Sequence, residues 1–497
     1  MRPGARLLGP LLFLGALLPG RALAQEAPSA SAPPSVVVIV TDDQRSDTLW
    51  AMPVVQRELV ARGASFPDAF VVNPICCPSR ASILTGAYSH TTGVYRQTPP
   101  FGRFEWFRDT STLATWLDDA GYTTGLFGKY IDGYQRPGLT GYVPPGWDRW
   151  EGFVHAGYHD YKLSVDGEIR SFGESPQDYS TVVLGREAEA FVRDAEGPLF
   201  LYLAPAAPHG PAVPAPGDEG AYADLSPWRP TSFDEVDVSD KPEWVRALPR
   251  LDAAERERID TLRANQYRSL LAVDRAVDGV LQALRETGRL ENTLIVYTSD
   301  NGLAWGEHRW TKKEAPYEEV IRVPIVVRWD AGGVVPASSP DALALNVDLA
   351  PTIAEAVGVP APGAEGRSLL PALRGSPDPD PREDFLIEHL AGTNPVPTYC
   401  AVRSRDWAYV RYADGQEELY ALPTDPWELE NLVGDPSVRS VLAERRQRLE
   451  TLCDPPPPGY GESGLDARVA LAVAVLFALF VLGALGSRAA ANRVVPR

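Results

Sequence analysis

The chain is poor in cysteine and has a large excess of acidic over basic residues. It holds four cysteines in 497 residues, with no Cys-x-x-Cys pair of the kind found in zinc sites, which argues against a zinc-stapled fold. The isolated Cys400 and Cys453 could pair in an oxidising compartment. The formal net charge of -19 argues against a nucleic-acid partner, because binding to a phosphate backbone needs a basic surface. If the substrate is an anion, positive charge must be concentrated locally.

Two apolar segments lie at the ends of the chain. Residues 1–24 combine arginines, an apolar run and a small-residue site at Ala22-Leu23-Ala24, which predicts a cleaved signal peptide. Residues 467–487 carry one charge, at Arg468, and are followed by further arginines, which predicts a transmembrane helix with a cytoplasmic tail. A proline-rich linker at 456–466 precedes this helix. The sequence therefore predicts an extracytoplasmic domain whose C-terminus is anchored in the membrane.

The region between these segments alternates apolar runs with amphipathic patterns. Short continuous apolar runs predict buried parallel strands at 35–40, 122–127, 198–204, 292–298 and 322–329. Residues 111–121, with a serine cap, and residues 265–287 carry apolar side chains at helical spacing. This alternation predicts an α/β fold, in which a large, mostly parallel sheet lies between helix layers.

The pattern of apolar and polar residues changes after a proline- and aspartate-rich segment at 376–384. Residues 376–455 predict a smaller α+β domain with an antiparallel sheet, a hairpin turn at Asp414-Gly415 and a final charged helix. The catalytic domain is therefore expected to cover residues 36–375, with this C-terminal domain following it.

Unusual polar residues follow four of the five predicted strands. The four groups are Thr41-Asp42-Asp43-Gln44, Gly128-Lys129, Pro208-His209 and Ser299-Asp300-Asn301-Gly302. Ligands of open α/β sheets bind beyond the carboxyl ends of the strands, so the groups predict one shared site. Four of these residues are hard oxygen donors that suit Ca²⁺ or Mg²⁺, namely Asp42, Asp43, Asp300 and Asn301. The alternative is that each acidic pair forms an ordinary turn or a solvated corner.

Cys76 and Cys77 stand at the predicted start of a helix. Pro78 fits the first helical turn and Gly86 can end the helix. A helix N-terminus attracts anions and favours a thiolate, and Arg80 adds positive charge one turn further on. The alternative is a helix start with incidental cysteines.

These residues carry a resemblance to a known family. The run Cys76-Cys77-Pro78-Ser79-Arg80 followed by ASILTG resembles the sulfatase signature CxPSRxxxLTG. Further blocks similar to those of sulfatases follow in the expected order, among them TDDQRSDTL, TGLFGKY, APHGP and SDNGLAWGEHRWTKKEAPYEEVIRVPIVVR. The chain is most similar to the branch that contains glucosamine-6-sulfatases and related glycosaminoglycan sulfatases.

The resemblance implies a cofactor and a set of site residues. In this family the first cysteine of the signature, Cys76 here, is oxidised to formylglycine by a formylglycine-generating enzyme. The residues implied to hold one divalent metal, usually Ca²⁺ with Mg²⁺ as the alternative, are Asp42, Asp43, Asp300, Asn301 and the modified Cys76. Those implied to surround the sulfate are Arg80, Lys129, His209 and Lys313. Lys313 is chosen over Lys312 because the family places its lysine four residues before the tyrosine, here Tyr317.

The implied mechanism is covalent catalysis. A hydroxyl of the hydrated aldehyde attacks sulfur, and His209 or Lys313 protonates the departing oxygen. Many sulfatases carry a GKxH pattern whose histidine acts on the formylglycine hydroxyl, but this chain has Gly128-Lys129-Tyr130-Ile131. The candidates for the missing base are Asp132 and His308. Lysine is scarce in this chain, which has only five. Three of them, at 129, 312 and 313, fall in the implied site.

Three functions are consistent with the sequence. The first is a membrane-anchored, extracytoplasmic sulfatase acting on sulfate monoesters of sulfated sugars or glycosaminoglycan-like glycans. The second is a phosphodiester or phosphonate monoester hydrolase on the same scaffold. The third is a catalytically silent, glycan-binding surface protein, which the full set of metal, nucleophile and lysine residues disfavours.

Overall fold

The computed structural model describes residue 1 and residues 32–135, 138–378 and 380–461. The chain divides into two units, residues 1–33 and residues 34–497, and the fold below is that of the second unit. The predicted signal peptide, apart from residue 1, and the predicted membrane helix at 467–487 lie outside the described residues. Within the described ranges, no helix is both long enough and apolar enough to cross a membrane.

A nine-stranded sheet forms the centre of this unit, with the strand order β2-β10-β9-β1-β8-β4-β5-β6-β7. Its five parallel strands are β1 (Ser35–Thr41), β4 (Thr123–Gly128), β5 (Arg149–His155), β8 (Leu199–Ala204) and β9 (Thr293–Ser299). Antiparallel pairs extend the sheet at both edges: β10 (Ile325–Arg328) pairs with β9 and β2 (Ala64–Ser65) with β10, while β6 (Lys162–Val165) pairs with β5 and β7 (Glu168–Ser171) with β6. The mostly parallel α/β fold is therefore confirmed, as are four of the five predicted parallel strands.

The fifth prediction was wrong in direction, because β10 runs antiparallel to β9, with Ile325 opposite Thr298. A parallel pair needs a long crossover, usually through a helix that returns the chain to the other end of the sheet. Residues 300–324 contain only the four-residue helix α7 (Glu318–Ile321), and β10 starts at the sheet edge where β9 ends. An apolar run shows that a strand is buried, but it does not show the strand's direction.

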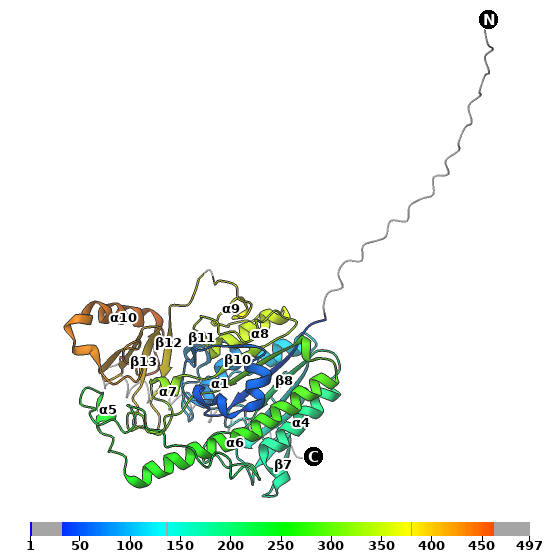
Figure 1. Ribbon diagram of the computed structural model, residues 1–497, viewed down its shortest axis with the longest axis horizontal. Coiled ribbons are helices and arrows are strands. Elements are labelled where there is room, and N and C mark those ends of the chain that lie inside the picture. The colour runs from blue at the N-terminus through cyan, green and yellow to red at the C-terminus, as the bar shows by residue number, and fades with distance from the viewer. Residues whose placement is uncertain (2–31, 136–137, 379, 462–497) are drawn as a thin grey trace, which may run out of the picture. The chain divides into compact units, whose positions relative to one another are not determined.

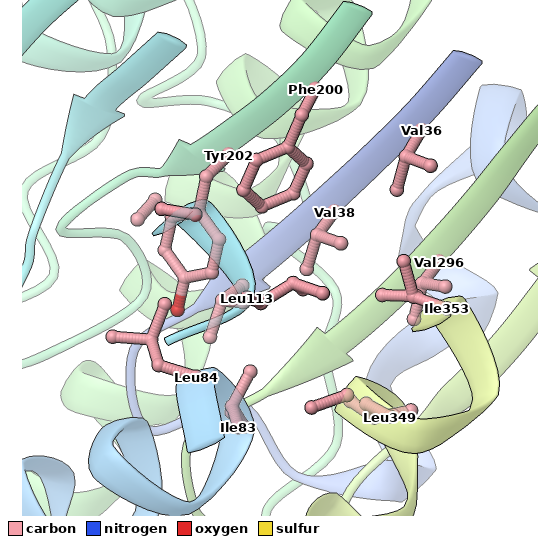
Figure 2. Close-up of a cluster of buried hydrophobic side chains, with 14 of the residues drawn as sticks. Val36, Val38, Ile83, Leu84, Leu113, Phe200, Tyr202, Val296, Leu349 and Ile353 are labelled. Atoms are coloured by element: carbon pink, nitrogen blue, oxygen red, sulfur yellow. The ribbon is translucent and has the colours of Figure 1, made fainter. Parts of the chain in front are cut away.

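Helices cover both faces of the sheet. On one face, Val36 and Val38 of β1 pack with α1 (Cys76–Thr85), α3 (Leu113–Asp119) and α8 (Leu349–Val357), as Figure 2 shows. On the other face, Val37 and Ile39 pack towards α4 (Ser180–Asp194) and α6 (Ala253–Glu286), which lie side by side (Figure 1). This alternation along β1 is the two-residue period of a strand that is buried on both faces.

Both predicted helices are present, with different starts. The N-cap of α3 is Thr112, whose amide donates to Oγ1 of Thr115 at 2.9 Å, so the predicted serine cap was wrong by one residue. Helix α6 begins at Ala253, twelve residues before the predicted start, because the Asp252 side chain accepts a hydrogen bond from the Glu255 amide. The first turns of α6 are mostly polar and exposed, so a search for apolar residues at helical spacing misses them.

The C-terminal region contains the predicted antiparallel sheet. Its strands are β12 (Asp384–His389), β13 (Tyr399–Ser404), β14 (Trp407–Tyr412) and β15 (Glu417–Ala421), and α10 (Arg439–Leu452) packs against them (Figure 1). The Asp414-Gly415 turn is confirmed, with Gly415 at a φ of 87°. A disulfide joins Cys400 of β13 to Cys453 after α10, as the sequence allowed.

The remaining elements are short. They are strands β3 (Ala69–Phe70) and β11 (Ala344–Leu345), helices α2 (Ser89–Thr92), α5 (Glu243–Arg246) and α9 (Leu370–Leu373), 3-10 helices at Ser46–Ala51, Pro176–Asp178, Leu290–Asn292, Asn346–Asp348, Leu432–Gly434 and Pro436–Val438, and a π-helix at Val55–Val60.

Removal of the disulfide should destabilise the C-terminal region. The bond links residues 53 apart in the sequence, and a loop of that length corresponds to about 4 kcal/mol of unfolding free energy in the chain-entropy model. Urea denaturation should therefore show the Cys400→Ala/Cys453→Ala protein to be less stable than the wild type by about 2–5 kcal/mol. Dithiothreitol should weaken the wild type to the same level and leave the double variant unchanged; a wild type insensitive to the reductant would contradict this.

His90 links helix α2 to two carboxylates that are distant in the sequence. Its Nδ1 lies 3.0 Å from Oε1 of the buried Glu388, and its Nε2 lies 3.2 Å from Oε1 of Glu365. Burial opposes protonation of the ring, but the two carboxylates outweigh it and raise the pKa of His90 to about 10. The charged ring therefore stabilises the fold fully below its ordinary pKa of 6.5, and this contribution is lost as the pH rises from there through about 10.

The His90→Gln variant should be less stable than the wild type by about 3 kcal/mol at pH 6, because it leaves the buried Glu388 without a cation. The difference should shrink at pH 9.5, where the wild-type ring begins to lose its proton. Urea denaturation of both proteins at the two pH values measures it, with the exposed His155→Gln as the control. A gap that does not change with pH would rule out the charged ring as its cause.

Candidate active site

The polar residues that follow β1 and β9 meet at the carboxyl edge of the sheet. The amide of Asp300 donates to the carbonyl of Thr41 at 3.1 Å, and the amide of Asp43 donates to Oδ1 of Asp300 at 3.1 Å. Asp43 itself has a left-handed backbone, with a φ of 63°, so the chain turns sharply where β1 ends. The structure thus brings together the polar groups for which the sequence predicted one site.

Three carboxylates and one thiol form the centre of this site. One side-chain atom from each of Asp42, Asp43, Cys76 and Asp300 lies within 4.8 Å of the others, and all four residues are buried. Sγ of Cys76 lies 3.5 Å from Oδ1 of Asp42. The cysteine is the first residue of α1, as predicted, and Gly86 ends that helix at a φ of 71°.

Asn301 completes the set of oxygen donors. Its Nδ2 donates to Oδ1 of Asp43 at 2.6 Å, while its Oδ1 is buried without a hydrogen-bond partner among the described residues. An unpaired buried carbonyl oxygen is costly, and here the same amide group contacts the Asp43 carboxylate. The donor set is rich in oxygen and contains no imidazole, so these residues fit a hard divalent cation such as Ca²⁺ or Mg²⁺.

Basic side chains surround the carboxylates. Arg80 Nε lies 2.7 Å from Oδ2 of Asp300, and its Nη1 donates to the carbonyl of Lys129 at 3.0 Å. Lys129 Nζ lies 2.5 Å from Oδ2 of Asp42. Lys313 Nζ lies 2.8 Å from both Oδ1 of Asp43 and Sγ of Cys76. A chain with a large negative charge thus concentrates three fixed positive charges around Cys76.

Gly128 allows Lys129 to take this position. Its φ is +118°, and a Cβ atom there would lie 2.0 Å from the carbonyl oxygen of Ala204 on the neighbouring strand β8. The close approach lets the Lys129 amide donate to that oxygen at 2.7 Å, which directs the lysine from the end of β4. A larger residue at 128 would push the two strand ends apart.

The charges in the site stabilise one another. Burial alone would raise the pKa of Asp42, but Lys129, His209 and Arg80 outweigh it and hold this pKa below its usual range. Burial alone would lower the pKa of Lys129, and the Asp42 carboxylate outweighs it and raises that pKa. At neutral pH the pair is therefore ionised.

The Cys76 thiol, unlike the Asp42 and Lys129 side chains, is not ionised. Burial raises its pKa well above the usual value, and Asp300 and Asp42 raise it further against the opposing effect of Lys129 and Lys313. Burial and the carboxylates therefore act against the thiolate that the sequence predicted at the helix N-terminus. The unmodified side chain is a neutral thiol, which does not favour direct thiolate catalysis.

His209 lies at the open side of the site. Its Nδ1 is 2.7 Å from the carbonyl of Gly210, and its Nε2 is 3.6 Å from Oδ2 of Asp43. Since a carbonyl can only accept, Nδ1 carries the proton of that bond and Nε2 faces the carboxylates. The side chain is 44% exposed, so a bound ligand can reach it from solvent.

The two candidates for the missing base lie in different surroundings. His308 is fully buried, with Nδ1 2.7 Å from Oε2 of Glu235 and its ring 4.1 Å from that of Tyr317, and no described contact joins it to Cys76. The suggestion that it acts on residue 76 stays a prediction. Asp132 accepts a hydrogen bond from Nε2 of Gln97.

Three residues near the site were missed by the sequence reasoning. Gln97 Oε1 also accepts from the amide of Cys77 at 3.0 Å, which links Asp132 to the start of α1. Glu314 is buried next to Lys313, and burial raises its pKa to about 7. Asn394 donates to Glu314 and accepts from Lys312 at 3.1 Å, so Lys312 points to that loop and Lys313 to Cys76. The position of Glu314 directly after Lys312 and Lys313 could have indicated its place near the site. Gln97 and Asn394 belong to no motif that could have indicated theirs.

Comparison with known proteins establishes the class. The model of the sulfatase family matches residues 34–359, and a model described as N-sulphoglucosamine sulphohydrolase, C-terminal, matches residues 306–454. The chain therefore belongs to the sulfatase family.

Individual proteins are similar over much of the chain. An extracellular sulfatase SULF-1 homolog of Drosophila melanogaster is 34% identical over 372 residues, which cover 71% of this chain and 33% of the fly protein. Human N-acetylglucosamine-6-sulfatase is 30% identical over 474 residues, which cover 85% of both proteins. A protein solved in complex with its substrate D-glucosamine-2-N,6-O-disulfate shares the fold, with a TM-score of 0.76 at 23% identity over 86% of this chain and all of that one.

Proposed function

We propose that this protein is a sulfatase that hydrolyses sulfate monoesters on sulfated sugars or glycosaminoglycan-like glycans. The observation that carries the proposal is the position of Cys76. The signature places this cysteine in the frame that is converted to formylglycine, and the fold sets its Sγ 3.5 Å from Asp42 and 2.8 Å from Lys313. The names of the relatives, an extracellular sulfatase and an N-acetylglucosamine-6-sulfatase, support the class of substrate.

Two groups would be added to the side chains described. A single Ca²⁺ or Mg²⁺ would be held by Asp42, Asp43, Asp300, Asn301 and the modified residue 76; when bound, it supplies positive charge that polarises the sulfate ester. Formylglycine, formed from Cys76 by a formylglycine-generating enzyme, supplies a hydrated aldehyde whose hydroxyl can attack sulfur.

The basic residues would bind and neutralise the sulfate. Lys129 and Lys313 carry full charges beside Cys76 and would lie against the equatorial oxygens of the ester, where negative charge accumulates in the transition state. Arg80 is fixed on both sides, by the Asp300 carboxylate and the Lys129 carbonyl, and would orient residue 76.

His209 and Asp132 would move the protons. Both ring nitrogens of His209 would carry a proton, with Nδ1 keeping its own in the bond to the Gly210 carbonyl. As the bond between sulfur and the sugar oxygen breaks, Nε2 would give its proton to that oxygen, so that the sugar leaves as an alcohol. Asp132 would act as the base toward the hydroxyl groups that a hydrated formylglycine at residue 76 carries. Its partner Gln97 also binds the amide next to Cys76, which supports this choice.

A substrate panel tests the proposal. The full chain, produced together with a formylglycine-generating enzyme, would be assayed on 6-O-sulfated N-acetylglucosamine, an aryl sulfate, an aryl phosphodiester and an aryl phosphonate monoester. We expect sulfate release with a kcat/KM at least about 100-fold above that for either phosphorus ester, a difference of about 2.7 kcal/mol in transition-state binding. Faster phosphorus-ester hydrolysis would favour the second function, and glycan binding without any turnover would favour the third.

We also propose that the catalytic domain acts outside the cytoplasm, tethered by residues 467–487. Expression in a bacterial host should place the full chain in the membrane fraction, where protease added from the extracytoplasmic side digests the folded part. A chain ending at residue 461 should be released as free protein. Recovery of both chains in the cytoplasm would contradict the proposal.

A further inference from the structure

A second group of metal-ligating side chains is buried outside the candidate active site. One ring nitrogen of His308 and one carboxylate oxygen each of Glu319 and Glu428 lie within 4.8 Å of one another. Their exposed fractions are 0%, 9% and 2%. His308 and Glu319 belong to the connection between β9 and β10, and Glu428 follows β15 of the C-terminal sheet. We refer to these three residues as the His308 cluster.

Two atoms of the His308 cluster are unsatisfied. Nε2 of His308 and Oε2 of Glu319 are buried and have no hydrogen-bond partner among the described residues. The other ring nitrogen of His308 is engaged, since Nδ1 lies 2.7 Å from Oε2 of Glu235. A carboxylate on one nitrogen of a histidine fixes the ring and leaves the other nitrogen free to bind, and this is the usual arrangement of metal-ligating histidines.

The two carboxylates of the cluster also lack a counter-charge. Among the described residues, no lysine or arginine forms an ion pair with Glu319 or Glu428. Neighbouring basic side chains are bound to other groups: Arg45 to Asp47 and Glu307, Arg322 and Arg403 to Glu318, and Lys241 to the backbone oxygens of Glu428 and Leu429. Glu428 Oε2 accepts from the Glu318 amide at 2.9 Å, and burial raises the pKa of both glutamates. An unpaired buried carboxylate is destabilising by several kcal/mol, so the cluster must bind either protons or a cation.

We propose that the His308 cluster binds a zinc ion through His308, Glu319 and Glu428. One imidazole nitrogen with two carboxylate oxygens is a donor set that zinc accepts, whereas Ca²⁺ and Mg²⁺ take oxygen donors. Zinc holds its ligands at about 2.0–2.2 Å, so binding draws the three side chains closer together. A cavity of about 410 Å³, lined in part by Glu318, Glu319 and Trp427, provides an entry path from solvent.

The site has a structural consequence for the proposed active site. His308 and Glu319 bracket the segment that carries Lys313, and Glu428 belongs to the C-terminal region. Zinc at the cluster would therefore fix this segment from both of its ends and join it to the residues that follow β15. The site is distinct from the oxygen-rich group at Asp42, Asp43 and Asp300, which takes a different class of cation.

The experiment measures zinc by elemental analysis after EDTA treatment, dialysis and reloading of the full chain with Zn²⁺. We expect one zinc per wild-type chain and less than about one-fifth of that in Glu319→Gln and Glu428→Gln. Zn²⁺ should raise the thermal midpoint of the wild type but not of these two variants. In EDTA, Glu319→Gln should be at least as stable as the wild type, because it removes an unpaired buried charge. The exposed Glu355→Gln serves as the control and should behave as the wild type.

Separate outcomes distinguish this site from the proposed active site. Asp43→Asn alters the oxygen-rich group and should still bind zinc at the cluster, whether or not the protein is a sulfatase. Three results would overturn the proposal: both glutamine variants retain zinc, Asp43→Asn loses zinc, or the wild type binds none. A wild type without zinc would mean that protons or water satisfy the cluster. If a variant fails to fold, X-ray absorption of the wild type decides, since a single nitrogen with oxygen ligands is expected and sulfur ligation contradicts it.

Discussion

Cys76→Ala is expected to abolish sulfate-ester hydrolysis, with kcat/KM lowered by at least about 10⁴-fold, because the nucleophile of the proposed mechanism is made from this side chain. The methyl group of alanine cannot be oxidised to an aldehyde, so the variant cannot form the proposed nucleophile. Steady-state assays on an aryl sulfate and on 6-O-sulfated N-acetylglucosamine measure the loss.

The neighbouring cysteine is the matched control. Cys77 is equally buried, at 1% exposed, but it occupies the variable position of the signature. Cys77→Ala should keep kcat/KM within about fivefold of the wild type, and its thermal midpoint shows whether the fold is intact. Equal losses in the two variants would mean that the start of α1 tolerates no change, and substantial activity in Cys76→Ala would remove this residue from the mechanism.

Lys313→Gln is expected to lower kcat/KM by about 10²–10³-fold, the usual effect of removing one charge that stabilises a transition state. Its ammonium lies 2.8 Å from both Asp43 Oδ1 and Cys76 Sγ. The neighbouring carboxylates raise the pKa of Lys313 well above its usual value against the effect of burial, so its charge is constant across the assay range. The loss should therefore appear at every pH from 5 to 9.

Lys312→Gln is the control for this prediction, because the adjacent lysine is exposed and binds Asn394 instead. It should keep kcat/KM within about threefold of the wild type. If Lys312→Gln were the damaging change and Lys313→Gln the mild one, the assignment of the two lysines would be reversed. Equal loss in both would point to a disturbed loop, which a lowered thermal midpoint would reveal.

Much of the fold follows from local patterns in the sequence. The runs that became β1, β4, β8 and β9 are continuous and apolar because each strand is buried on both faces by helices. The direction of β10 could not be predicted, because the same pattern fits either direction and the long connection before it carries no helical period. The start of α6 was placed too late because its first turns are solvent-exposed and therefore polar.

The site was predictable to the extent that its residues stand at strand ends. Asp42 and Asp300 directly follow parallel neighbours in the sheet, so topology alone brings them together. Gln97, Glu314 and Asn394 reach the site from loops whose positions depend on distant contacts. His308 shows the reverse case, because the sequence does not indicate that this histidine contacts Glu235, which is far away in the sequence.

The central claim is that Cys76 becomes formylglycine. Mass spectrometry of the tryptic peptide from Gly63 to Arg80 tests it most directly, using protein made in its native host or together with a formylglycine-generating enzyme. We expect the mass of an aldehyde at Cys76 that a hydrazide traps, with Cys77 unmodified. A peptide in which Cys76 is entirely an unmodified thiol under those conditions would contradict the account.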